Sequence, residues 1–248
     1  MIVDLGTGGT SLLSLLRPKL ILKQPNARPE LRAAFRGFPG WRLSEHQGLS
    51  DERMPLRNLL ISAQSLALVV ESQDPYTASH QRRVARLAAA IAQEMGLSSQ
   101  HVQEIYFAGL VHDVGKIFLP PEILGKPGCL TDEQMATVKT HPRSGYESLT
   151  SLGFYGSVAE VVLQHHERLD GSGYPQGLTV DSIPLPARVV AVADVVGAAA
   201  SDRPYRPARS MTQVLDAVLQ DQGVLYDREV VHAFRTLVTI KGYDLGSE

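Results

Sequence analysis

The stretch His112-Asp113-Val114-Gly115-Lys116 ends an otherwise apolar run and places an imidazole next to a carboxylate. Burying a carboxylate beside a histidine is unfavourable unless another group compensates both. A divalent metal ion is the usual compensation, because neutral imidazole and carboxylate oxygen are good ligands for manganese, iron and zinc. From these five residues alone, a hydrogen-bonded His-Asp pair at a helix end is the simpler interpretation. The other histidines of the chain decide between the two.

The composition is that of an ordinary globular protein. The chain has 248 residues, 44% hydrophobic and 20% charged, which suits one domain or one domain with an appendage. The formal net charge of -2 gives no bulk attraction to DNA or anionic lipid, so an anionic substrate would need a local cluster of Lys and Arg. The single cysteine, Cys129, excludes an internal disulfide and favours a reducing compartment. No segment reaches the ~20 apolar residues of a membrane span, and no signal peptide is evident, so we expect a cytoplasmic protein without membrane insertion.

The chain changes its pattern near residue 55. Residues 1–54 are interrupted by glycine and proline and carry no motif, which indicates an irregular N-terminal segment, a linker, or the remnant of an input domain. From residue 55 to residue 248, apolar residues recur at helical spacing and no strand pair is evident. This pattern predicts an all-α, bundle-like domain.

The expected helices have recognisable ends. One runs from Pro55 to about residue 70, and the next begins near Thr77, carries His80 in its first turn and ends with Gly96 as its C-terminal cap. A third starts after Ser98 or Ser99 and runs into the His-Asp pair. Later helices begin at capping boxes, at a proline or at N-cap residues. These starts are Thr131–Gln134, Ser157–Glu160, Pro186, Ser210 and Asp227. We expect loops at 120–128 and 168–186.

Seven imidazoles and carboxylates end or interrupt apolar helix faces. They are His80, His112, Asp113, His141, His165, His166 and Asp194. Each alone is more often structural, but seven at the inner ends of separate helices indicate one shared site. Adjacent helical residues point ~100° apart, so the paired histidines can share a metal only if their helix ends there. The carboxylate of the His-Asp pair could bridge two ions, as in dinuclear hydrolases.

With these motifs in place, the chain resembles the HD-GYP subgroup of the HD superfamily of metal-dependent phosphohydrolases. The resemblance is carried by HDVGK at 112–116 and HHERLDGSGYP at 165–175. Supporting stretches are DPYTASH at 74–80, IPLPAR at 183–188, VAD at 192–194 and SDRPYR at 201–206. The similarity covers roughly residues 55–240, and the motifs are specific as a set in this order.

The resemblance implies an HD-domain helical bundle with its catalytic domain at 55–248 and phosphodiesterase activity on the bacterial second messenger cyclic di-GMP. The product would be linear pGpG, with hydrolysis on to GMP left open. A dinuclear or trinuclear centre of iron or manganese is implied, and we expect two divalent ions because Tyr76 stands where members with three metals carry a glutamate. One would be held by His80, His112, Asp113 and Asp194, and the other by Asp113, His141, His165 and His166. Asp113 and Lys116 would be catalytic, and the positions matching phosphate- and nucleotide-contacting residues are Lys116, Tyr174, Arg203 and Arg206.

Some residues leave alternatives open. The family usually carries an aspartate, expected near Lys116, where this chain has Gly197, and three-metal members carry a glutamate where Tyr76 stands. Glu167 could orient one of the paired histidines or be a plain surface charge. Residues 1–54 are too short for a complete receiver domain, so a separate input domain or a signalling protein is an expected partner. The alternative function is a cyclic-dinucleotide-binding or protein-docking module with slow or no turnover, and another cyclic dinucleotide or a phosphomonoester is an alternative substrate.

Overall fold

The computed structural model describes residues 65, 79–152, 156–201 and 207–245, all within the unit Met54–Glu248. Several predictions lie outside these ranges. They are the irregular segment 1–54, almost all of the helix expected from Pro55, Tyr76, Arg203 and Arg206. The predicted domain boundary at residue 55 stays a prediction.

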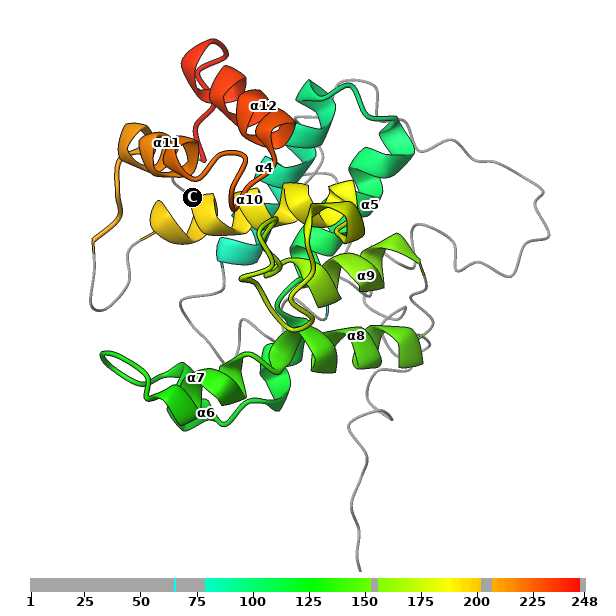
Figure 1. The fold of residues 1–248 in the computed structure, drawn as a ribbon, viewed down its shortest axis with the longest axis vertical. Helices are drawn as coiled ribbons and strands as arrows, with labels where there is room; N and C mark the ends of the chain where they lie inside the picture. The colour runs from blue at the N-terminus through cyan, green and yellow to red at the C-terminus, as the bar shows by residue number, and fades with distance from the viewer. Residues whose placement is uncertain (1–64, 66–78, 153–155, 202–206, 246–248) are drawn as a thin grey trace, which may run out of the picture. The chain divides into compact units, whose positions relative to one another are not determined.

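The described residues form nine α-helices and two short 3-10 helices (Figure 1). The helices that build the centre of the fold are α4 (His80–Glu94), α5 (Ser99–Val111), α8 (His141–Ser151), α9 (Ser157–Gln164) and α10 (Leu185–Ala199). The others are η2 (Val114–Phe118), α6 (Pro121–Leu124), α7 (Asp132–Val138), η3 (Val180–Ser182), α11 (Met211–Gln220) and α12 (Arg228–Thr239). No strand occurs in the described ranges, only two isolated bridges. The predicted all-α class is confirmed.

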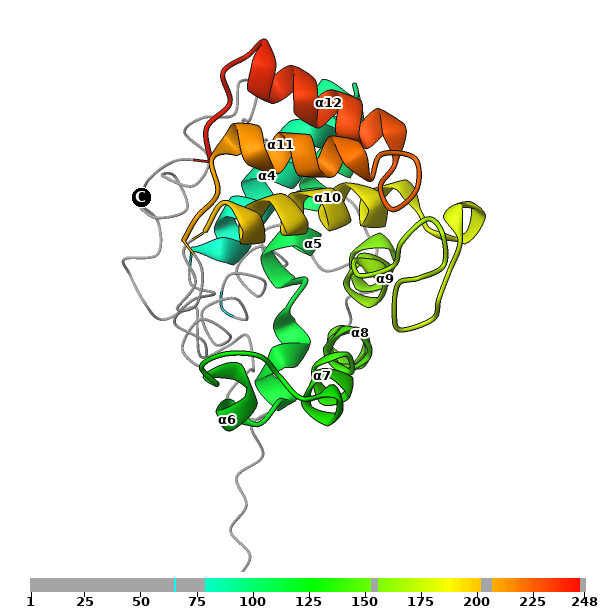
Figure 2. The ribbon, with the colours of Figure 1, turned by 60° about the vertical axis from the view of Figure 1, so that its left-hand side comes forward.

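The core lies where α4 packs against α5 and α10. On α4, the side chains of Val84, Leu87 and Ile91 are completely buried. α4 and α5 cross closely, because a Cβ on Gly109 would lie only 2.7 Å from the Cα of Ala85. In Figure 2, α12, α11 and α10 lie one beneath another, and α9 and α8 continue the stack, in agreement with the contacts between successive members. None of the described helices is long and apolar enough to cross a membrane.

Most of the predicted caps are confirmed. Thr131 and Ser210 each form a capping box with the glutamine three residues later. Asp227 accepts hydrogen bonds from the backbone N–H groups of Glu229 and Val230, and Ser98 accepts one from that of His101. Gly96 follows α4 with φ +74°, a left-handed conformation that favours glycine. These caps depend on contacts within one helical turn, so the sequence alone reveals them.

One predicted cap and one predicted loop were wrong. Ser157 is not an N-cap but the first residue of α9, because Gly156, with φ +82°, takes the capping position. The Ser157 hydroxyl instead donates to Glu104 Oε2 at 2.8 Å and so joins α9 to α5. The loop expected at 120–128 contains the short helix α6, in which Pro121 occupies the first turn, where its missing N–H has no cost.

Candidate metal centre

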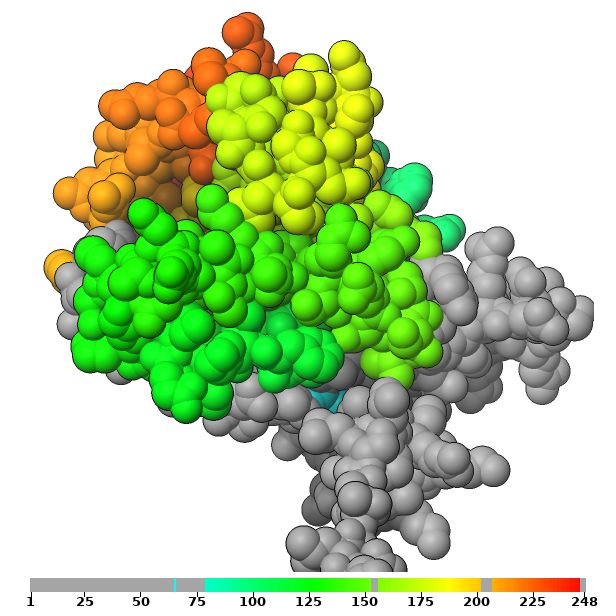
Figure 3. Space-filling model, turned by 60° about the horizontal axis from the view of Figure 1, so that its bottom comes forward, coloured from blue at the N-terminus to red at the C-terminus, as the bar shows by residue number. Residues whose placement is uncertain are grey.

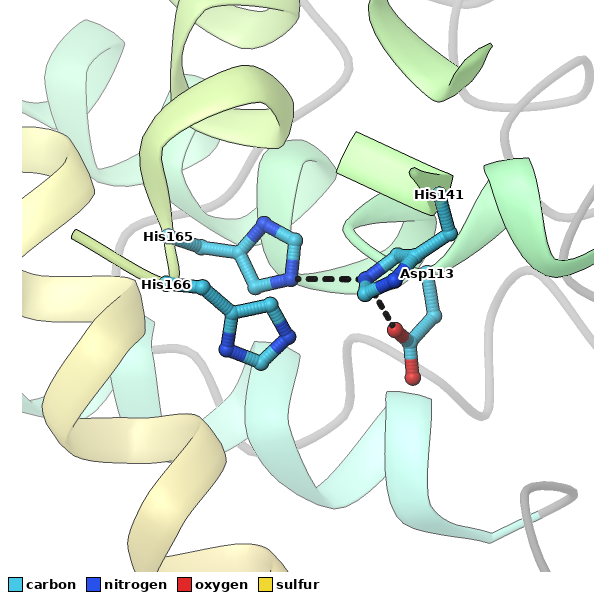
Figure 4. Close-up of side chains that lie close together, drawn as sticks. All are labelled: Asp113, His141, His165 and His166. Atoms are coloured by element: carbon cyan, nitrogen blue, oxygen red, sulfur yellow. Dashed lines mark hydrogen bonds and ion pairs between the residues drawn. The ribbon is translucent and has the colours of Figure 1, made fainter. Parts of the chain in front are cut away.

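The structure brings all seven predicted imidazoles and carboxylates together in two adjoining groups of potential metal ligands. The first group is Asp113, His141, His165 and His166, and the second is His80, His112 and Asp194. Within each group, one donor atom per residue lies within 4.8 Å of the others. Figure 4 shows the first group, with the rings of the paired histidines directed towards His141 and Asp113.

Helix ends place most of these side chains. His80 and His141 are the first residues of α4 and α8, while His112 and His165 cap the C-termini of α5 and α9. α9 ends at Gln164, so the backbone leaves the helix at the paired histidines, and their ring centroids lie 4.1 Å apart. This is the helix ending that the sequence required for both rings to face one site.

Asp113 lies between the two groups and turns one oxygen towards each. Its Oδ1 is 3.2 Å from Nε2 of His141, in the first group. Its Oδ2 is 3.3 Å from Nε2 of His112, in the second group. The two groups are each closed by a further contact, 3.4 Å between the Nε2 atoms of His141 and His165 and 3.1 Å from His80 Nε2 to Asp194 Oδ1. One carboxylate can therefore serve two cations, which is the arrangement expected of a bridging ligand.

Backbone carbonyl groups orient three of the imidazoles. Nδ1 of His112 lies 2.8 Å from the carbonyl oxygen of Gly109, and the corresponding distances are 2.7 Å for His141 to Val138 and 2.8 Å for His165 to Val162. A carbonyl oxygen only accepts, so each Nδ1 carries the proton and donates it. The lone pair of each ring is then on Nε2, which faces the centre and is available to a cation.

A glycine lets η2 lie directly on α8. A Cβ on Gly115 would be 1.9 Å from the carbonyl oxygen of His141 and 2.6 Å from the backbone nitrogen of Gly145. Those neighbours are backbone atoms and cannot move aside cheaply, so any side chain at 115 would separate η2 from α8. The glycine of the HDVGK motif therefore sets the distance between Asp113 and His141.

The electrostatics favour ionised carboxylates beside neutral imidazoles. Burial would raise the pKa of Asp113, but the ammonium of Lys116, 2.7 Å from Oδ2, and the neighbouring His112 hold that pKa well below its ordinary value. Burial also opposes ionisation of Asp194, yet the hydrogen bond from His80 and the nearby histidines keep its pKa well below the usual range.

Burial disfavours the charged imidazolium and therefore lowers the pKa of most of the histidines. It lowers the pKa of His80, lowers that of His165 well below its ordinary value, and lowers that of His166 to about 3. His112 differs, because the two carboxylates outweigh its burial and raise its pKa. Ionised carboxylates and neutral imidazoles are the protonation states in which these groups bind metals.

The donors fit a divalent metal centre. Nε2 of His112 is fully buried and makes no hydrogen bond within the described residues, although oxygens of Asp113 and Asp194 lie 3.3 and 3.7 Å away. A buried nitrogen without a hydrogen bond is unfavourable unless a cation uses its lone pair. Mixed imidazole and carboxylate donors suit manganese, iron or zinc.

The Gly-Tyr-Pro segment borders this centre. The ring of Tyr174 stacks on His166 with centroids 4.7 Å apart, and its backbone N–H donates to the carbonyl oxygen of His166 at 3.2 Å. Gly173 permits this approach, because a Cβ there would lie 2.4 Å from the backbone of Glu167 and Arg168. Burial raises the pKa of the Tyr174 phenol, so it stays protonated near neutral pH.

A cation that the sequence did not single out lies beside this tyrosine. The ammonium of Lys139, an exposed residue after α7, is 5.3 Å from the centroid of the Tyr174 ring. In Figure 3 the green segment that contains α7 and the yellow-green segment that follows α9 border each other on one face. No sequence spacing connects Lys139 to Tyr174, so only the tertiary structure reveals this pair.

Glu167 has neither of the roles considered from the sequence. Its side chain is buried, so it is not a surface charge, and its carboxylate binds backbone amides rather than a histidine. Oε1 accepts from the N–H of Gln176 at 2.7 Å, and Oε2 accepts from the N–H of Leu178 at 2.9 Å. Glu167 therefore fastens the loop that carries Tyr174.

Gly197 lies beside a histidine, and the expectation that an aspartate at this position would lie near Lys116 stays a prediction. The atoms nearest to a Cβ at 197 would be Val84 Cγ2 at 3.0 Å and two ring atoms of His80 at 3.4 and 3.5 Å. Lys116 is not left mobile by the missing aspartate, because its ammonium binds Asp113. The sequence could not show this, since the helical position of residue 197 does not tell which neighbouring helix it faces.

Comparison with known proteins identifies the family of the chain. The HD domain family model matches residues 64–230. The cyclic di-GMP phosphodiesterase response regulator RpfG of Xanthomonas campestris is 44% identical over 68% of this chain and 45% of its own length. A cyclic di-GMP phosphodiesterase of Thermotoga maritima is 42% identical over 69% and 47%, and the 3'3'-cGAMP-specific phosphodiesterase 1 of Vibrio cholerae is 37% identical over 67% and 38%. The chain spans less than half the length of each of these relatives.

Solved structures share the fold. An HDG"Y"P protein from Bdellovibrio bacteriovorus superimposes with a TM-score of 0.57 at 17% identity, over 74% of this chain and 64% of that one. The HD domain of the Listeria monocytogenes phosphodiesterase PgpH gives 0.54 at 18% identity, over 71% and 97%. At these identities the likeness concerns the helical fold alone.

Proposed function

Because the chain belongs to the HD-domain family, as its HD-GYP motifs predicted, we propose that it is a metal-dependent phosphodiesterase that hydrolyses cyclic di-GMP. The observation that carries the proposal is Asp113, whose two oxygens face two separate groups of imidazole and carboxylate donors. The relatives named as cyclic di-GMP phosphodiesterases support the substrate. A cyclic dinucleotide is an anion, and a chain of near-neutral net charge can attract it only through a local cluster of Lys and Arg.

The proposed centre holds two ions per chain. Asp113, His141, His165 and His166 would hold one, and His80, His112 and Asp194, with the second oxygen of Asp113, the other. When bound, two divalent cations polarise a phosphate ester and lower the pKa of water. Iron and manganese both suit this donor set, and the turnover assay described below compares protein loaded with either metal.

The residues around the centre have separate proposed roles. We assign Lys116 the role of supplying positive charge to the phosphate. Its ammonium lies at the centre, 2.7 Å from the proposed bridging carboxylate of Asp113. Tyr174 can donate a hydrogen bond to a phosphate oxygen, because its phenol stays protonated. Arg203 and Arg206, matched by the family motif, would grip phosphate in a bidentate way. A separate input domain or signalling protein is the proposed partner, as for a response regulator.

Two ions rather than three are proposed because Tyr76 stands where three-metal members carry a glutamate. A neutral phenol is a poor ligand for a hard divalent ion near neutral pH. With one Lewis acid fewer, hydrolysis should give mainly linear pGpG, and its further hydrolysis to GMP should be slower. Elemental analysis of anaerobically purified protein tests the number, and three occupied sites per chain would contradict it.

Two other functions remain to be tested against the main proposal. The Vibrio cholerae relatives named as 3'3'-cGAMP-specific phosphodiesterases favour a different cyclic dinucleotide as substrate. Gly197, which lies beside His80 where the family usually carries an aspartate, favours the slow or inactive cyclic-dinucleotide-binding or protein-docking module. The first alternative shares the catalytic centre and differs in the bases recognised, whereas the second differs in turnover.

A turnover assay distinguishes these functions. Protein loaded anaerobically with manganese or reduced iron is incubated separately with cyclic di-GMP, 3'3'-cGAMP and a phosphomonoester, and products are identified by mass spectrometry. We expect linear pGpG as the main product, and none with metal-stripped protein. Binding of cyclic di-GMP without any linear product at full metal loading would contradict the enzyme proposal.

A further inference from the structure

One of the four buried histidines of the centre lacks the support that the other three have, and the fifth histidine, His166, is partly exposed. Nδ1 of His112, His141 and His165 each donate to a backbone carbonyl, whereas Nδ1 of His80 has no hydrogen-bond partner within the described part of the chain. His80 as a whole residue is only 2% exposed, so bulk water does not replace that partner. Among the four buried histidines, the Nδ1 without a partner therefore belongs to the group His80, His112 and Asp194.

The side of the ring that carries Nδ1 faces a helix surface without a side chain. A Cβ on Gly197 of α10 would lie 3.4 Å from Nδ1. The carbonyl oxygen of Gly197 accepts a hydrogen bond from the Ser201 hydroxyl at 2.5 Å. The backbone acceptor of Gly197 is therefore already used by a residue that follows α10. Gly197 thus occupies the position from which a polar side chain could reach Nδ1, and it offers none.

We propose that Gly197 makes the group His80, His112 and Asp194 the weaker of the two metal sites, so that the two ions bind in a fixed order. A cation on Nε2 of His80 requires the proton to be on Nδ1, and a buried N–H without an acceptor is unfavourable. Loss of such a partner typically lowers metal affinity by about 10- to 100-fold. The group Asp113, His141, His165 and His166 fills first. This inference rests on the two-ion centre of the proposed function.

Two substitutions at one position isolate the missing acceptor. Gly197→Ser adds a hydroxyl one bond beyond a Cβ that is 3.4 Å from Nδ1, within reach of a hydrogen bond. Gly197→Ala adds the same Cβ, with the same close contact to Val84 Cγ2 and a similar gain in helix propensity, but no acceptor. The difference between the two variants therefore reports the hydrogen bond to His80.

The measurement is a stepwise titration of metal-stripped protein with manganese, in which electron paramagnetic resonance reports free and bound ion. The spin-coupled spectrum reports the filled pair. We expect the wild-type protein to bind two ions per chain, the second about 10-fold or more weakly. Gly197→Ser should strengthen the second step by about 10- to 100-fold relative to Gly197→Ala and leave the first unchanged. His80→Ala should remove the weaker ion and keep the tighter one.

Several results would overturn the proposal. They are equal affinities in the wild-type protein, equal second steps in the Ser and Ala variants, or loss of the tighter ion in His80→Ala. Circular dichroism checks that each variant is folded, and the wild-type titration decides the matter if a variant is not. Absence of binding of both manganese and, in an anaerobic titration, ferrous iron would contradict the proposed function itself. Two ions with equal affinity would contradict only the order of loading.

Discussion

Replacing Glu167 by glutamine should loosen the loop that carries Tyr174 without disturbing the metal ligands. The buried carboxylate accepts from the N–H groups of Gln176 and Leu178 at 2.7 and 2.9 Å, and such charge-assisted bonds contribute about 1.5 to 3 kcal/mol each. Glutamine keeps one acceptor oxygen, turns that bond into a neutral one, and sets an NH2 group against the other backbone N–H. The loop should therefore lose about 2 to 4 kcal/mol of local stability.

Amide hydrogen exchange of metal-free protein measures this local stability. At 1.36 kcal/mol per factor of ten, exchange at Gln176 and Leu178 should accelerate by about 30- to 1,000-fold. Glu147→Gln, on the exposed side of α8, is the matched control and should leave both amides unchanged. Unaltered protection in Glu167→Gln, or an equal effect in Glu147→Gln, would refute the assignment of Glu167 as the residue that fastens this loop.

Four further predictions concern the centre itself. Asp113→Ala should abolish turnover and empty both metal sites, so two ions per chain by elemental analysis would exclude a bridging role. Lys116→Met should lower kcat while metal content stays at the wild-type level, and an unchanged kcat would remove Lys116 from the mechanism. Arg203→Ala and Arg206→Ala should each weaken cyclic di-GMP binding in calorimetry with metal content intact, and unaltered affinity in both would place them outside the substrate site. The pKa of His166 is lowered from 6.5 to about 3 on folding, so its neutral form stabilises the metal-free protein above pH 6.5. That contribution is lost as the pH falls towards 3, which urea unfolding at a series of pH values should show, and a flat profile between pH 6.5 and 3 would contradict it.

The sequence predicted the fold well where short-range contacts determine it. The caps at Thr131, Ser210 and Asp227 are bonds within one helical turn. Apolar spacing along α4 shows directly which side of that helix is buried. The N-cap of α9 was assigned to Ser157 and not to Gly156, because the capping-box pattern beginning at Ser157 was the stronger signal and the cap depends on the left-handed conformation of Gly156. A serine can satisfy that pattern and still point its hydroxyl at another helix.

The site was predicted as a set of residues, not as an arrangement of atoms. Seven chemically suitable side chains at helix ends indicated that they meet, and the structure does gather them. Which oxygen of Asp113 faces which group, and which nitrogen of His80 lacks a partner, depend on how separate helices pack. The role of Glu167 was missed for the same reason, because its backbone partners are remote in the sequence.

The backbone contact between η2 and α8 limits how the metal preference of this protein could be redesigned. Peptide groups, rather than side chains, meet at Gly115, so the spacing between Asp113 and His141 cannot be widened by repacking nearby residues. A larger ion that needs longer bonds, such as calcium, would have to deform two helices at once. Exchanging donor atoms at fixed positions, for example an imidazole for a carboxylate, leaves that contact intact. Selectivity in this scaffold should therefore be altered through the chemistry of its ligands and not through the size of the cavity.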